Sequence, residues 1–351
     1  EYAILEYSGY GIYYHTDWNS SANFTLKNSK IRYSGSYGVR SYGHRQQSSI
    51  VLEDNEITGV ESDAIYMWSG DQATVTIKRN KISDSNGGGV RFNNMGAVIF
   101  EDNELTNNKN GTFDTSYSYG DVSVKNNVFK NNGDGYLRFY HPYQVYGDFD
   151  SDGVMSILVE GNSIIEEDTD RWGGRLEFSN MRSAVDILIQ NNTIENRSTA
   201  IQLDGDFNNK VKILGNSIKG TKQEQTGIYL SQKITGTIEN NTIENKHNGI
   251  YVQYSDANGD GSGVIKGNVI KDNSGYGIRV ESYAKPVISL NDIENNSGYF
   301  VDNQTEYTVD ARNNWWGETL KAVIESGDNP RALDKFYDQY DDSTKGLINY
   351  A

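Results

Sequence analysis

Tyrosine, tryptophan and arginine recur beside one short motif of the chain, a Gly-Ile or Gly-Val pair followed by alternating apolar residues. The residues between these apolar positions would share one face of a sheet. They include Tyr13, Arg40, Tyr42, Tyr66, Trp68, Arg91, Arg138, Tyr140, Tyr229, Tyr251 and Arg279. Aromatic rings stack on sugar rings, and guanidinium groups donate hydrogen bonds to hydroxyl and carboxylate oxygens. The pattern predicts a polysaccharide-binding face, although such residues also pack as ladders on a parallel sheet without a ligand.

Two acidic loops have the spacing of a calcium-binding turn, with oxygen ligands at alternating positions and a glycine after them. The loops contain Asp148, Asp150 and Asp152, and Asp256, Asn258 and Asp260. The bidentate glutamate expected at the twelfth position is missing, because Val159 and Gly267 stand there. These loops are therefore not EF-hands. Two readings stay open: calcium completed by backbone oxygens, or Asx turns without a metal.

Charged residues near the two longest insertions are the candidates for catalysis. Glu177 and Asp204 fall on consecutive repeats, and two carboxylates on one face could act as general acid and base on a glycosidic bond. Arg138, Tyr140 and His141 could instead neutralise a uronate and remove its C5 proton, as a lyase requires. Neither set completes a hydrolase or lyase signature, so the sequence favours binding over catalysis.

A repeat of about two dozen residues positions all of these side chains. An asparagine between two apolar residues marks each unit, as in the segments 52–57 and 238–243. The markers are Asn55, Asn80, Asn103, Asn127, Asn162, Asn192, Asn216, Asn241, Asn268, Asn291 and Asn314. Apolar residues alternate within each unit, which is the period of a strand. We expect short parallel strands that stack coil upon coil, each coil burying an apolar face on the next.

The marker asparagines have a physical explanation. Asparagine tolerates the left-handed backbone of a sharp corner, and identical amides one coil apart can hydrogen-bond along the array. The 36 glycines suit tight corners. Proline, which would remove a backbone N–H donor from the sheets, occurs only 3 times. The expected fold is all-β, a single parallel β-helix of about twelve coils.

Composition narrows the classes of function. The 32 basic and 48 acidic residues give a net charge of −16, which argues against a nucleic-acid or anionic-membrane partner. No apolar run reaches the roughly 18 residues that span a bilayer. Cysteine is absent, which excludes disulfides and thiolate metal sites and fits a bacterial secreted or cell-surface protein at least as well as a cytosolic one.

The Asn-x-Ile units over residues 20–316 resemble those of the right-handed parallel β-helix repeat proteins, the pectate-lyase-like superfamily that includes NosD-type periplasmic and surface proteins. The ending Asn-Asn-Trp-Trp-Gly at 313–317 and the acidic tail after it resemble how many of them finish. The resemblance implies a right-handed parallel β-helix over residues 1–316. It also implies a C-terminal cap over residues 317–351 that contains an α-helix and covers the open end of the β-helix. In architecture and aromatic content the chain is also similar to the tāpirin class of cellulose-binding adhesins, an analogy of fold.

Together these observations predict a secreted or cell-surface protein that binds polysaccharide, from the plant cell wall or another insoluble source, as an adhesin or a substrate-docking domain. One alternative is a calcium-assisted lyase or a glycoside hydrolase acting in a groove on the same face. A second is a passive structural stalk. Because Ile4 already lies inside a coil with no cap before it, we expect the chain to be a domain of a larger protein. We also expect this domain to be monomeric.

Overall fold

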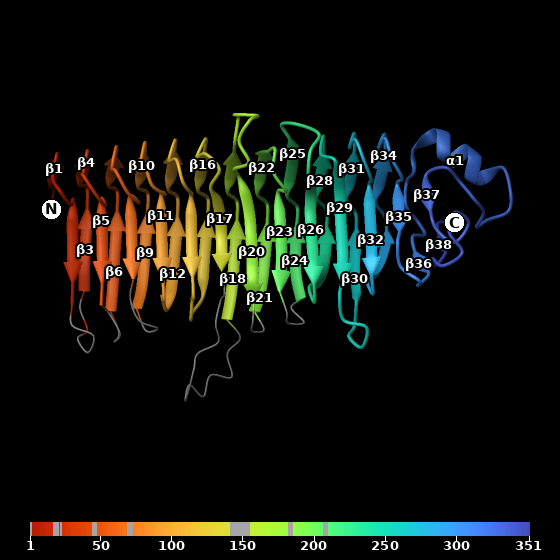
Figure 1. Ribbon diagram of the computed structural model, residues 1–351, viewed down its shortest axis with the longest axis horizontal. Coiled ribbons are helices and arrows are strands. Elements are labelled where there is room, and N and C mark those ends of the chain that lie inside the picture. Colours follow the sequence, from red (N-terminus) through yellow and green to blue (C-terminus); the bar gives the residue numbers. More distant parts are fainter. Residues whose placement is uncertain are drawn as a thin grey trace. The chain divides into compact units, whose positions relative to one another are not determined.

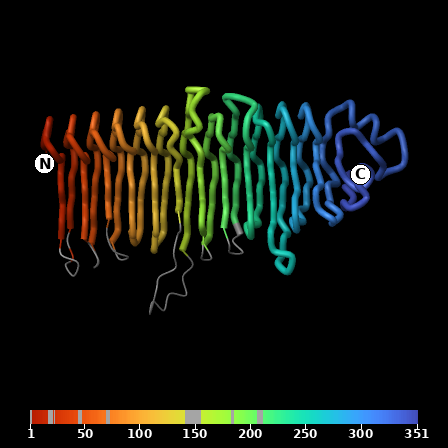
Figure 2. Tube along the Cα trace, in the orientation of Figure 1, coloured from red at the N-terminus to blue at the C-terminus, as the bar shows by residue number. Residues whose placement is uncertain are grey.

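The computed structural model consists of two compact units of parallel strands, Glu1–Leu188 (unit 1) and Ile189–Ala351 (unit 2). The structure describes residues 2–16, 21, 23–43, 48–68, 73–140, 155–181, 185–205 and 210–351. In each unit, every coil contributes one strand to each of three parallel sheets, named A, B and C here. Figure 1 labels many of the strands, and Figure 2 follows the same coils along the Cα trace.

In unit 1, neighbouring strands of a sheet come from successive coils. Sheet A contains β1 (Ile4–Glu6), β4 (Lys30–Arg32), β7 (Glu56–Thr58), β10 (Lys81–Ser83), β13 (Glu104–Thr106), β16 (Val128–Lys130) and β19 (Ser163–Ile165). Sheet B contains β2 (Ile12–His15), β5 (Val39–Tyr42), β8 (Ile65–Trp68), β11 (Val90–Asn93), β14 (Phe113–Ser116), β17 (Tyr136–Tyr140) and β20 (Arg175–Met181). Sheet C contains β3 (Asn23–Lys27), β6 (Ser48–Glu53), β9 (Ala73–Lys78), β12 (Ala97–Glu101), β15 (Val122–Lys125) and β18 (Met155–Glu160), and β21 (Val185–Gln190) contains the unit boundary.

Unit 2 repeats this arrangement. Sheet A contains β22 (Thr193–Asn196), β25 (Ser217–Gly220), β28 (Thr242–Glu244), β31 (Val269–Lys271) and β34 (Asp292–Glu294). Sheet B contains β23 (Ile201–Gly205), β26 (Thr226–Gln232), β29 (Asn248–Tyr254), β32 (Ile278–Ser282), β35 (Val301–Asn303) and β37 (Phe336–Tyr337). Sheet C contains β24 (Lys210–Leu214), β27 (Thr235–Glu239), β30 (Ser262–Lys266), β33 (Lys285–Ser289), β36 (Val309–Asp310) and β38 (Ile348–Asn349).

The strand count agrees with the repeat read from the sequence. Among the described residues, sheet A has seven strands in unit 1 and five in unit 2, in line with the expected number of about twelve coils. The predicted fold class, an all-β parallel β-helix with a C-terminal segment that contains a helix, is confirmed.

The core lies inside each coil, where the alternating apolar residues of the three sheets meet. In β9 the side chains of Ala73, Val75 and Ile77 are fully buried, and the residues between them are more exposed. Ile77 lies in register between Leu52 and Phe100 of the neighbouring coils, and both are also fully buried. Strand alternation therefore sends one set of side chains inward and leaves the other set on the outer face.

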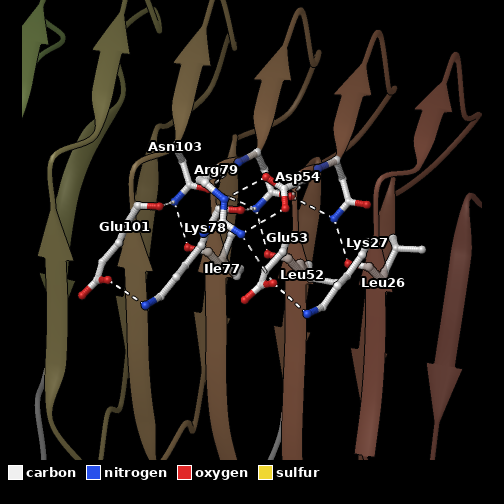
Figure 3. A network of polar contacts seen from close by, with 12 residues as sticks. Leu26, Lys27, Leu52, Glu53, Asp54, Ile77, Lys78, Arg79, Glu101 and Asn103 are labelled. Carbon is white, nitrogen blue, oxygen red and sulfur yellow. Dashed lines mark hydrogen bonds and ion pairs between the residues drawn. The ribbon is translucent and has the colours of Figure 1, made fainter. Parts of the chain in front are cut away.

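An asparagine ladder runs along the corner between sheets C and A. In unit 1 the Nδ2 of Asn80 donates to Oδ1 of Asn103, and the Nδ2 of Asn103 donates to Oδ1 of Asn127, both at 3.0 Å. Asn103 also donates to the carbonyl of Ile77 at 2.9 Å (Figure 3). The same amide chain runs through residues 192–314 of unit 2. The predicted stacking of identical amides is confirmed.

The left-handed backbone lies one residue before each ladder asparagine. Asp54 and Arg79, which precede Asn55 and Asn80, have φ angles of 57° and 54°. The expectation that the marker asparagine itself adopts this conformation is therefore wrong, because its role is to pair its amide inside the corner. Asp54 and Arg79 lie on the outer surface and form an ion pair with each other at 2.8 Å (Figure 3).

The C-terminal segment covers the last coil of unit 2. Trp316 precedes α1 (Gly317–Glu325), and its ring packs edge-on against Phe336 at 4.9 Å. Phe336 stacks on Tyr350 at 4.6 Å. Strand β37 pairs with β35, and β38 with β36, so the segment continues sheets B and C beyond the last repeat. In the part of the chain that the structure describes, no helix is long and apolar enough to cross a membrane.

Candidate functional site

The outer face of sheet B in unit 1 carries most of the residues predicted to bind polysaccharide. Strand pairing aligns a first column and a second column, two residues further along each strand. The first column contains Tyr13, Arg40, Tyr66, Arg91, Asp114, Arg138 and Glu177. The second contains His15, Tyr42, Trp68, Asn93, Ser116, Tyr140 and Ser179. The structure thus brings the eight predicted residues of unit 1 onto one face.

An aromatic ladder occupies the first three coils of this face. It consists of Tyr10, Tyr13, His15, Tyr42 and Trp68, and consecutive ring centroids are 6.1, 6.2, 5.6 and 4.2 Å apart. Tyr10 and Tyr13 are 52% and 55% exposed. The ladder therefore offers a continuous strip of rings that solvent, or a ligand, can reach.

A cluster of three tyrosine rings surrounds the guanidinium of Arg40. The Cζ atom of Arg40 lies 5.5 Å from the ring centroid of Tyr13, 5.1 Å from that of Tyr37 and 5.7 Å from that of Tyr66. These distances are within the range of cation–π attraction. Arg40 with these three tyrosines is named the Arg40 cage.

A charged groove of about 320 Å³ lies further along the same sheet. Its lining includes Asp63, Arg91, Asp114, Asp134, Tyr136 and Arg138. Arg91 pairs with Asp63 at 3.6 Å, and Arg138 with Asp114 at 2.6 Å. Gly135 forms part of the floor, where an added Cβ would lie 2.2 Å from the Cα of Gly111. The backbones of Gly111 and Gly135 can approach this closely only because Gly135 has no side chain.

Sequence reasoning missed the acidic members of the charged groove. Asp114 follows Phe113 in a coil that has Gly-Thr-Phe in place of the Gly-Ile motif. Aligning Phe113 with Val90 by the repeat spacing would have placed Asp114 beside Arg91, as the register does. Asp63 lies in the turn before its strand, where strand alternation gives no prediction.

A loop over residues 166–172 is anchored through its backbone to Asp134, which lines the groove. The backbone N–H of Trp172 donates to Oδ1 of Asp134 at 2.8 Å. Glu166, which begins this loop, is only 1% exposed. Burial raises the pKa of the Glu166 carboxyl above its usual range, although the backbone N–H of Asp168 and the charge of Arg171 oppose the shift.

Replacing this buried carboxyl should make the protein more stable at neutral pH. Because the pKa of Glu166 is higher in the folded state, ionisation opposes folding once the pH exceeds the unfolded value of about 4.3. Glu166→Gln should therefore raise the urea midpoint at pH 7 and match the wild type at about pH 3.5. Lys130 lowers the pKa of the exposed Glu167, so Glu167→Gln should shift the pH 7 midpoint the opposite way. If the urea midpoint at pH 7 changed in the same direction and by the same amount in Glu166→Gln and Glu167→Gln, this account would be contradicted.

In unit 2 the predicted residues Tyr229, Tyr251 and Arg279 also come together on the outer face of sheet B. The rings of Tyr229 and Tyr251 stack at 4.8 Å. The Tyr251 hydroxyl donates to Glu281, and burial together with this carboxylate raises the pKa of Tyr251. Arg279 lies over the rings of Tyr251 and Tyr276 and forms an ion pair with Glu281.

Of the predicted catalytic residues, the structure brings together Arg138 and Glu177, which are register partners on neighbouring strands of unit 1. Glu177 lies in unit 1, where Arg175 pairs with it at 3.2 Å and the Ser179 hydroxyl donates to it at 3.1 Å. Asp204 lies in unit 2, opposite Ser231 of the next strand. His141 lies outside the described residues. A catalytic role for these residues stays a prediction.

The second acidic loop is held by its own backbone. Oδ1 of Asp256 accepts a hydrogen bond from the N–H of Asn258, and Oδ1 of Asp260 from the N–H of Ser262, both at 3.0 Å. These are Asx turns, and Lys233 pairs with Asp256 at 3.3 Å. Within the described ranges no three His, Cys, Asp or Glu side chains gather as metal ligands, so calcium has no support at this loop. The first loop, Asp148, Asp150 and Asp152, lies outside those ranges.

Two family models match the sequence. One, described as "Right handed beta helix region", matches residues 10–168. The other, described as "Periplasmic copper-binding protein (NosD)", matches residues 148–330, more than half of the chain. No curated protein and no solved structure matches the chain. The family matches confirm the predicted right-handed β-helix superfamily.

Proposed function

We propose that this chain, which belongs to the NosD family of right-handed parallel β-helix proteins, binds polysaccharide along the outer face of sheet B in unit 1. The aromatic ladder carries the proposal, because it joins rings of three successive coils into one strip whose first tyrosines are more than half exposed. Exposed contiguous aromatic surface on a soluble protein usually marks a binding site.

The arrangement suits a long polymer better than a free sugar. Coils of a parallel solenoid are spaced by about 4.8 Å, so the rings recur along the sheet instead of enclosing one pocket. Each ring contact with a sugar is weak, and several contacts on one chain add through their high effective concentration. Strand pairing places Asn93, beside the charged groove, next to Trp68 of the ladder, so the groove extends the same surface.

Removing two rings of the ladder should weaken binding strongly. The rings of Tyr42 and Trp68 lie 4.2 Å apart on the outer face, and buried aromatic anchors at interfaces contribute about 2 kcal/mol or more. The double variant Tyr42→Ala, Trp68→Ala should therefore lose roughly 30-fold in affinity, measured by affinity gel electrophoresis. Tyr340→Ala removes a tyrosine that is 49% exposed in the C-terminal segment and should bind like the wild type. Unchanged affinity in a folded double variant would exclude the ladder as the binding surface.

The charged groove favours binding over hydrolysis. Asp63 accepts the N–H of Gly88 at 2.7 Å, Asp114 pairs with Arg138, and Asp134 accepts the N–H of Trp172. Each of these carboxylates is thus already engaged by a donor of the protein, which does not suit a general acid that must hand a proton to the leaving group. They are, however, suitable acceptors for the hydroxyl groups of a sugar.

Copper, which the description of the matched family names, is not part of this proposal. Copper favours thiolate, thioether and imidazole ligands. The chain has no cysteine, and the side chains of its four methionines, Met67, Met95, Met155 and Met181, are all buried in the core. The residues that the structure describes hold no cluster of metal-ligating side chains and do not fit a copper site. The periplasmic placement in that description supports a location outside the cytoplasm, which we propose for this chain.

A further inference from the structure

Among the described residues, every arginine on the outer face of sheet B except one forms an ion pair with a carboxylate. Arginines of this face in both units form ion pairs with carboxylates of the same unit. The pairs are Arg91 with Asp63 (3.6 Å), Arg138 with Asp114 (2.6 Å), Arg175 with Glu177 (3.2 Å), and Arg279 with Glu281 and with Asp302 (3.4 Å). Their charges are therefore neutralised within the protein.

Arg40 is the exception. Its guanidinium lies among the rings of Tyr13, Tyr37 and Tyr66, at centroid distances of 5.1 to 5.7 Å. No carboxylate of the described ranges is within ion-pair distance of it, and its buried Nε has no hydrogen-bond acceptor there. The rings attract the positive charge, but they accept none of the directed hydrogen bonds that a guanidinium can donate.

The repeat explains why the carboxylate is missing. Arg175 and Arg279 receive theirs from two residues further along the strand. Arg138 receives its carboxylate from the same column of the neighbouring coil. Around Arg40 the corresponding positions are Tyr42 on the strand, and Tyr13 and Tyr66 in the column. Aromatic residues thus replace the acid at each of these places.

We propose that the ligand supplies the missing carboxylate, so that the Arg40 cage binds an acidic sugar of the polysaccharide. This inference rests on the proposed function and names its ligand class. A uronic acid presents a carboxylate that a guanidinium can bind in a bidentate manner, while its ring can stack on the neighbouring ladder. The net charge of −16 would repel a densely charged polymer. The fitting ligand is therefore a mainly neutral polysaccharide with occasional uronic acids.

The test compares glucuronoxylan with the same polymer after chemical reduction of its carboxyl groups. Affinity gel electrophoresis of the whole chain should show wild-type binding to glucuronoxylan about tenfold tighter than to the reduced polymer. Arg40→Gln should bind both polymers at the reduced level. Arg312→Gln, which removes an exposed arginine paired with Asp310, should keep the wild-type preference and serves as the matched control.

The outcomes separate this inference from the function on which it rests. Equal, measurable binding of both polymers by the wild type would overturn the inference and leave the proposed function standing. A preference that persists in Arg40→Gln would overturn it as well. Binding of neither polymer would overturn the inference as well, and the proposed function would fall only if cellulose and the other polysaccharides were not bound either. Equal binding by the wild type overturns the inference even if Arg40→Gln does not fold.

Discussion

Replacing Asn103 by alanine is expected to lower the free energy of unfolding by about 4 kcal/mol. The side chain is 1% exposed, and its Nδ2 donates to the carbonyls of Ile77 and Glu101 and to Oδ1 of Asn127. Its Oδ1 accepts hydrogen bonds from the backbone N–H and the Nδ2 of Asn80. Alanine leaves these buried groups without partners, and each orphaned group costs about 1–3 kcal/mol. Urea denaturation followed by far-UV circular dichroism measures the loss.

A surface asparagine of the same unit provides the matched control. The Nδ2 of Asn86 donates to Oε2 of Glu61 at 2.7 Å on the exposed side of the coil. Because water can replace this bond, Asn86→Ala should cost less than about 1 kcal/mol. If Asn103→Ala were no less stable than Asn86→Ala, the amide ladder would not be what holds successive coils together.

The second large effect is expected at Lys246, a fully buried lysine of unit 2. Its Nζ donates to the carbonyl of Asn196 at 2.9 Å, to the side-chain oxygen of the same residue, and to the carbonyl of Ser198 at 2.7 Å. These acceptors lie about 50 positions earlier in the chain, roughly two repeats. The ammonium therefore ties non-adjacent coils together from inside the solenoid.

Lys246→Met keeps a chain of similar length but removes every donor. Hydrogen bonds from a charged group contribute about 1.5–3 kcal/mol, and the abandoned carbonyls stay buried, so we expect a loss of about 3 kcal/mol. Lys219→Met, on an exposed position of β25, should change stability by less than about 0.5 kcal/mol in the same urea titration. A Lys246→Met protein as stable as the wild type would show that this network contributes nothing to folding.

The repeat made the fold predictable from the sequence. One asparagine and three apolar positions per coil recur with little variation, and strand alternation then decides which side chains face outward. The same logic placed Tyr66 and Trp68 on one face correctly. It failed where a coil departs from the motif, as at Asp114, and in the turns, where no period fixes the direction of side chains such as Tyr10 and Tyr37.

The partners of the arginines could not be predicted for a related reason. The carboxylate of an ion pair comes from the same strand for Arg175, but from the neighbouring coil for Arg138. The choice between these two ion pairs depends on the side-chain conformations of the arginine and the carboxylate. The repeat pattern of the sequence does not specify these conformations. The isolation of Arg40 became visible only when these partners were known.

The most direct test of polysaccharide binding is co-sedimentation of the purified chain with insoluble or gelled polysaccharides: cellulose, xylan, pectate and alginate. Analysis of each supernatant for released oligosaccharides completes the measurement. We predict that the protein sediments with at least one mainly neutral polysaccharide and that the supernatant stays free of oligosaccharides. Protein that remains soluble with every polysaccharide, or oligosaccharides that accumulate over time, would contradict the account.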